Sequence, residues 1–108
     1  MPTLNPSPKL QDFQRYVAEL EAERGFLDQG VIAKCLLLGE EVGELFKAVR
    51  KQEKLFLDKT AKVGAIKDEL ADIFIYLCAI ANRYNIDLET AFHEKEAINK
   101  QRTWCVAD

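Results

Sequence analysis

The sequence predicts an all-α protein, a four-helix bundle, from three observations. Glycine and proline are scarce, with 5 and 3 among 108 residues, so the chain lacks the many turns of a β-sandwich. Apolar residues recur every three or four positions in several long segments, as in amphipathic helices. No segment shows the polar–apolar alternation of a half-buried strand. The length favours one domain, expected over residues 1–108, with 1–8 as a flexible arm and 103–108 as a flexible or interface tail.

The ends of the expected helices are marked by capping residues. Ser7 is a suitable N-cap for the first helix, and Pro8 suits its first position. Gly25 and Gly30 bracket a loop, and Asp87 is a good N-cap for the last helix. The four helices are predicted over about residues 9–24, 31–54 and 65–84, and from Asp87 onward.

Composition and charge exclude several classes of function. Fifteen basic residues stand against 18 acidic ones, so the net charge of −3 provides no basic field for nucleic acid. The longest apolar stretches, residues 35–38 and 73–80, are far shorter than the roughly 20 residues of a membrane span. The three cysteines form no C-x-x-C pair. We expect a cytoplasmic protein with reduced thiols that binds neither nucleic acid nor membrane.

The most informative feature is that carboxylates interrupt the apolar stripes of two successive helices. Glu41 lies three residues after Leu38 and four before Leu45, which places it on the apolar face. Glu69 interrupts the stripe of the third helix in the same way. A helix whose acids only face solvent would place them opposite that stripe.

Each of these two acids has an acidic neighbour three residues later, Glu44 after Glu41 and Asp72 after Glu69. Such i, i+3 pairs project from one face of a helix. If the two helices pack antiparallel, four carboxylates meet and need a neutralising cation. Oxygen ligands of this kind suit Mg²⁺, and Mn²⁺ as an alternative. Spacing alone also allows a solvated acidic surface.

Other metal and phosphate chemistries find little support. A di-iron bundle needs Glu-x-x-His pairs, but the only histidine, His93, stands three residues after Thr90. A zincin motif would need a second histidine where Ala97 stands. The sequence also contains no glycine-rich phosphate-binding loop.

The two acidic motifs, EEVGEL at 40–45 and DELADI at 68–73, resemble the MazG family of all-α nucleoside triphosphate pyrophosphatases. Residues 81–89 and 95–102 also resemble that family, and the likeness covers about residues 31–104. It implies Mg²⁺-dependent hydrolysis of (deoxy)nucleoside triphosphates to the monophosphate and pyrophosphate, a house-cleaning role in the nucleotide pool.

The resemblance also implies roles for individual residues. Carried over by position, Glu41, Glu44, Glu69 and Asp72 would be the metal ligands, and Glu40 beside them is the candidate general base. The segment before the second helix would help to form the nucleobase pocket. The substrate-binding residues that it suggests are Tyr76, Asn82, Lys95, Asn99 and Arg102, with Lys47 as a weaker candidate.

Several of these residues have a simpler interpretation that the sequence leaves open. Tyr76 lies one turn beyond Asp72 on the same face and could equally be a packing residue. Asn82 could cap the helix end, and Lys47 could be an exposed charge. Where relatives carry an aromatic residue or histidine for base contact, this chain offers only Phe13, Phe26 and Gln29, so the preferred base stays open.

Two further expectations concern the assembly of the chain into oligomers and an alternative to a catalytic function. The resemblance implies a homo-oligomer, a dimer or a dimer of dimers, and the nearly apolar segment 73–80 fits a helix buried on several sides. The alternative to an enzyme is a catalytically silent helical interaction or regulatory module. The complete set of four carboxylates favours the enzyme, because a scaffold gains nothing from clustering them.

Overall fold

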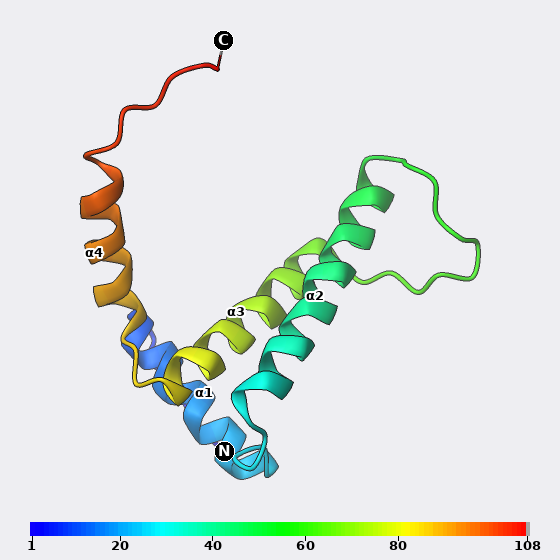
Figure 1. Cartoon of the computed structure of the whole chain (residues 1–108). Helices are drawn as coiled ribbons and strands as arrows, with labels where there is room; N and C mark the ends of the chain where they lie inside the picture. Colours follow the sequence, from blue (N-terminus) through cyan, green and yellow to red (C-terminus); the bar gives the residue numbers. More distant parts are fainter. Residues whose placement is uncertain (108) are drawn as a thin grey trace.

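The structure of the chain, a computed structural model, describes residues 1–107, which contain four helices and no strand (Figure 1). The all-α prediction is therefore confirmed. Asp108, the last residue of the predicted tail, lies outside the described residues. No helix in the described part of the chain is long and apolar enough to cross a bilayer. The helices are α1 (Leu10–Arg24), α2 (Val31–Gln52), α3 (Ile66–Arg83) and α4 (Leu88–Asn99).

The start of α1 differs from the prediction. Its N-cap is Lys9, whose backbone N–H donates to the Asp12 carboxylate at 2.9 Å. Asp12 therefore supplies the acceptor that Ser7 was expected to supply, and Pro8 precedes the cap instead of opening the helix. The prediction of a Ser7 cap was wrong because an acid inside the first turn satisfies the helix end from the other side.

The other helix ends follow from local backbone chemistry. Gly25 ends α1 in the left-handed conformation, at φ 75°, which glycine adopts without strain. Lys54 and Asn85 also have positive φ values, 60° and 54°, and α2 and α3 end shortly before them. The Asp87 carboxylate accepts a hydrogen bond from the Thr90 backbone N–H at 3.0 Å, which confirms the predicted N-cap of α4.

The helices form an open arrangement (Figure 1). Helices α2 and α3 run antiparallel side by side, α1 crosses one end of this pair against α3, and α4 packs mainly against α1. The buried core lies between α1 and α3, where Val17 and Leu20 meet Cys78 and Ala79. The rings of Phe13 and Phe74 pack edge to face beside this core, with centroids 5.4 Å apart.

One face of the α2–α3 pair is uncovered in the single chain. Ile32, Leu36 and Phe46 on α2 are 62–76% exposed, and they lie on the side of the helix opposite Glu41. Leu77 of α3, in the segment expected to be buried on several sides, is 43% exposed. The radius of gyration is 17.1 Å, against about 13 Å for a compact domain of roughly this length.

Candidate metal centre and adjoining cavity

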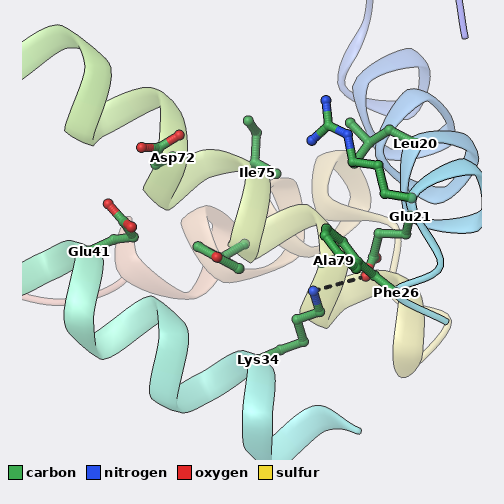
Figure 2. Close-up of a pocket in the computed structure, with 10 residues that line it drawn as sticks. Leu20, Glu21, Phe26, Lys34, Glu41, Asp72, Ile75 and Ala79 are labelled. Carbon is green, nitrogen blue, oxygen red and sulfur yellow. Dashed lines mark ion pairs between the residues drawn. The ribbon is translucent and has the colours of Figure 1, made fainter. Parts of the chain in front are cut away.

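Three carboxylates converge between α2 and α3. Glu41 of α2 and Glu69 and Asp72 of α3 each offer an oxygen atom, and these atoms all lie within 4.8 Å of one another. Figure 2 shows Glu41 and Asp72 facing each other across the gap between the two helices. Two oxygen atoms on opposite sides of a Mg²⁺ ion are about 4.2 Å apart. A small contraction of the side chains would therefore bring all three around one ion.

Gly64, just before α3, leaves the space that the Glu69 carboxylate occupies. A Cβ atom at Gly64 would overlap Oε1 of Glu69, so this carboxylate lies directly against the glycine backbone. Glu69 itself is only 9% exposed. The donor set is thus built of oxygen atoms on a constrained scaffold, and it fits a hard divalent cation.

The position of these carboxylates, partly buried and close together, raises the pKa values of groups in and beside the cluster. Burial first, then a hydrogen bond with Glu69 and the negative charges of the neighbouring acids, together raise the pKa of Glu41 to about 7. Burial, followed by the charges of Glu41, Asp72 and Glu40, also raises the pKa of the Tyr76 phenol. A cation at this place would relieve both effects.

The other acids of α2 lie at the edge of the cluster. Glu44 is not among the three converging carboxylates, and its Oε1 atom lies 3.3 Å from Nζ of Lys47, one turn further along the helix. Glu40 is exposed to solvent, close enough for its charge to act on Tyr76.

A cavity of about 200 Å³ leads away from the carboxylates. Glu41 and Asp72 lie at one end, and Phe26 and Lys34 lie at the other (Figure 2). Tyr76 also lines the cavity, with its ring 5.6 Å from Nζ of Lys34. Tyr76, proposed from the sequence as a substrate contact, thus faces the same cavity as the carboxylates. Phe26 reaches the cavity from the loop that joins α1 to α2.

Lys34 is the residue of this cavity that sequence reasoning missed. It is 3% exposed, and its Nζ atom lies 3.2 Å from Oε2 of Glu21 on α1. Arg83 of α3 holds the same carboxylate with two hydrogen bonds of 2.9 and 2.7 Å. The available signal was its position: Lys34 interrupts an apolar run seven residues before Glu41, two helical turns away on the same face.

The structure does not bring the remaining candidates to the carboxylates of the same chain. The side-chain amide of Asn82 donates to Gln14 O at 2.9 Å and accepts from Gln14 Nε2 at 3.2 Å, so it joins α3 to α1. Lys95 and Asn99 line a separate groove of about 480 Å³ between α4 and Leu10. Arg102 is exposed beyond the end of α4.

Comparison with known proteins identifies one domain family, several related sequences and similar solved structures. Residues 29–103 match the MazG nucleotide pyrophosphohydrolase domain. Human dCTP pyrophosphatase 1 is 35% identical over 93% of this chain, and a dATP/dGTP diphosphohydrolase of cyanophage S-2L is 34% identical over 73%. The chain spans 62% and 60% of the lengths of these two relatives. The crystal structure of iMazG from Vibrio DAT 722 superposes with a TM-score of 0.63 at 30% identity, over 85% of this chain and 94% of that one.

Proposed function

Because the chain belongs to the family of the MazG nucleotide pyrophosphohydrolase domain, we propose that it hydrolyses (deoxy)nucleoside triphosphates to the monophosphate and pyrophosphate. The observation that supports this most directly is the convergence of Glu41, Glu69 and Asp72 at the mouth of a cavity. Two relatives are named for deoxynucleoside triphosphates with different bases, which supports this substrate class but no single base.

Glu41, Glu69 and Asp72, with Glu44 beside them, are proposed to hold the divalent cation, Mg²⁺ or Mn²⁺. The cation would polarise the phosphate oxygens and neutralise the leaving pyrophosphate. Glu40, exposed next to the cluster, is proposed to orient a water molecule and accept its proton. The water oxygen bonds to the α-phosphorus while the bond from that phosphorus to the bridging oxygen of pyrophosphate breaks.

Lys95, Asn99 and Arg102 are proposed to contact phosphate oxygens in a neighbouring subunit, and the position of α4 supports this arrangement. Helix α4 packs mainly on α1, away from the carboxylates of its own chain (Figure 1). Of the cations on α2, Lys47 is engaged by Glu44, and Lys34, which lines the cavity, is paired with Glu21. Cations supplied by a second copy would complete the site.

Homo-oligomer formation is proposed through the uncovered face of the α2–α3 pair. Ile32, Leu36 and Phe46 form a continuous apolar stripe there, with Gly39 and Gly43 between them and no atom close to either glycine. The stripe allows a second helix to approach closely, and its burial would recover hydrophobic free energy that the single chain forgoes. A dimer, or a dimer of dimers, would use it.

A hydrolysis assay tests the proposed activity. The purified protein is incubated with each dNTP and with Mg²⁺ or EDTA, and pyrophosphate is scored separately from orthophosphate. We expect pyrophosphate with Mg²⁺ only, and a loss of about 100-fold or more in Glu41→Gln and Glu69→Gln, because each substitution removes an anionic ligand.

Glu19→Gln is the matched control for these variants, since Glu19 is an exposed carboxylate on α1 that does not belong to the converging cluster. It should retain full activity. Orthophosphate as the product would show that a different bond is cleaved. Activity that survives both ligand substitutions would contradict the assigned ligands, and no hydrolysis of any nucleotide would favour the silent interaction module.

A further inference from the structure

At the end of the cavity away from the metal-site carboxylates, two cations contact the single carboxylate of Glu21. Glu21 brings one negative charge, and the Arg83 guanidinium already neutralises it through two hydrogen bonds. Lys34 adds a second cation to the same carboxylate, and it is 3% exposed. Burial of an unneeded charge costs free energy. Lys34 thus adds one positive charge beyond the Glu21–Arg83 pair, and the Arg24 side chain also lines this cavity.

Aromatic faces, not further anions, complete the surroundings of Lys34. Its Nζ atom lies 4.9 Å from the centre of the Phe26 ring and 5.6 Å from that of Tyr76. Cation–π contacts stabilise an ammonium group but leave its N–H bonds available to a stronger acceptor. Phe26 and Tyr76 also provide flat apolar walls, on which a planar ring can stack.

The distance along α2 links this end to the carboxylates. Lys34 precedes Glu41 by seven residues on the same helical face, which is about 10.5 Å along the axis. A nucleotide whose phosphates lie at Glu41 and Asp72 and which fills the cavity would place its sugar next and its base toward Lys34. The base would then lie between two aromatic side chains with a cation at its polar edge.

We propose that Lys34 determines base specificity by donating a hydrogen bond to a carbonyl oxygen of the nucleobase. This inference rests on the proposed function for the position of the phosphates. Uracil, cytosine, hypoxanthine and guanine each carry a carbonyl oxygen that can accept from an ammonium group. Adenine carries no carbonyl oxygen: where hypoxanthine has one, adenine has an exocyclic amine, a donor that cannot pair with Lys34, and only ring nitrogens such as N7 are left as acceptors. Glu21 and Arg83 act as positioning residues that hold the ammonium in place.

The decisive comparison uses dITP and dATP, which share ring size but differ in the carbonyl. Wild-type kcat/KM should favour dITP over dATP by about 10- to 100-fold, the discrimination expected from one base-reading hydrogen bond. In Lys34→Met, which keeps the length but removes the donor, this ratio should fall to within about threefold of one. The loss should come from dITP, with dATP nearly unchanged. dUTP and dCTP should follow dITP.

Lys59→Met serves as the matched control, because it removes the same charge from an exposed position in the α2–α3 loop. If Lys34→Met fails to fold by thermal denaturation, Lys34→Gln replaces it: its amide can still donate to Glu21, but it accepts as well as donates hydrogen bonds, so the preference for dITP should again be lost. A wild-type enzyme without preference for dITP, or a variant that keeps the wild-type ratio, would overturn the proposal.

Failure of the proposed function is distinguishable from failure of this inference. If the wild-type protein hydrolyses no triphosphate, the proposed activity is wrong, and binding of dIMP and dAMP is then compared by NMR titration in EDTA. Preferential binding of dIMP that is lost in Lys34→Met would still support the role of Lys34. Equal binding of both monophosphates would overturn it without reference to catalysis.

Discussion

Among single residues, Glu41 is the one whose environment departs most from that of a solvated side chain. Burial, with a smaller effect of the neighbouring acids, raises its pKa from 4.5 to about 7. The protonated form of Glu41 is therefore the one that the metal-free fold favours. A cation would favour the ionised form instead, so that metal binding near pH 6 should release a proton.

This shift predicts how the stability of the metal-free protein depends on pH. Between pH 4.5 and about 7 the folded state holds a proton on Glu41 that the unfolded state has released. The free energy of unfolding should therefore fall as the pH rises through this window. Urea denaturation in EDTA at pH 5, 6, 7 and 8 measures the effect, and Glu41→Gln should remove this part of the slope.

The opposite contribution of Glu21 lies outside that window. Burial alone would raise the pKa of Glu21, but hydrogen bonds from Arg83 and Lys34 hold it below its usual value of 4.5. Its stabilising effect is complete above pH 4.5 and is lost only at lower pH, as the carboxylate becomes protonated. An equal slope in the wild type and in Glu41→Gln between pH 5 and 7 would contradict the assignment to Glu41.

On the scale of helices, Gln14 of α1 joins α1 to both α3 and the start of α4. It exchanges two hydrogen bonds with Asn82 of α3, and its Nε2 also donates to Ile86 O at 2.8 Å. Its Oε1 accepts from the backbone N–H of Leu88, the first residue of α4, at 2.9 Å. One buried amide thus fixes where α4 departs from the other helices.

Replacement of this amide should destabilise the fold. Gln14→Ala leaves the Leu88 N–H and one side of the Asn82 amide without their partners, and we expect a loss of about 2 to 3 kcal/mol in the free energy of unfolding. Urea denaturation of the variant measures the loss. Gln11→Ala, at an exposed position of the same helix, should change it by less than about 0.5 kcal/mol. Equal effects of the two substitutions would contradict the role of Gln14.

On the scale of the whole molecule, the single chain is open and leaves apolar side chains uncovered, which supports the proposed association with further copies. The radius of gyration of 17.1 Å and the exposed stripe of Ile32, Leu36 and Phe46 point in the same direction. The stripe lies on the face of α2 opposite Glu41. Association through it would leave the cavity and the carboxylates accessible.

A charge in this stripe should prevent association. Leu36→Glu is expected to shift the protein from a dimer or larger assembly to a monomer in sedimentation velocity, because a buried carboxylate would face a second apolar stripe. If phosphate contacts come from the partner, hydrolysis should fall with it. Phe56→Glu is the control: Phe56 is 97% exposed in the α2–α3 loop, outside the stripe. A wild-type monomer would contradict the assembly.

Much of the fold could be predicted because its causes are local. The helix ends at Gly25 and Asp87 depend on residues within a few positions, and the apolar period needs only the chain itself. The prediction of a Ser7 cap was wrong for an equally local reason. The Asp12 side chain accepts the hydrogen bond from the Lys9 backbone N–H, which a Ser7 cap would also need. The pairing of acids at i, i+3 likewise depends on helical geometry alone.

By itself, the sequence determined that the chain forms four helices, and it placed Glu41, Glu69 and Asp72 on helix faces that could meet. Both results follow from the spacing of residues along the chain. Only the tertiary structure decided that Lys34 joins Glu21 and Arg83 at the end of the cavity, because three helices must pack before those charges become neighbours. It likewise decided that α4 lies against α1, through hydrogen bonds between residues more than 70 positions apart.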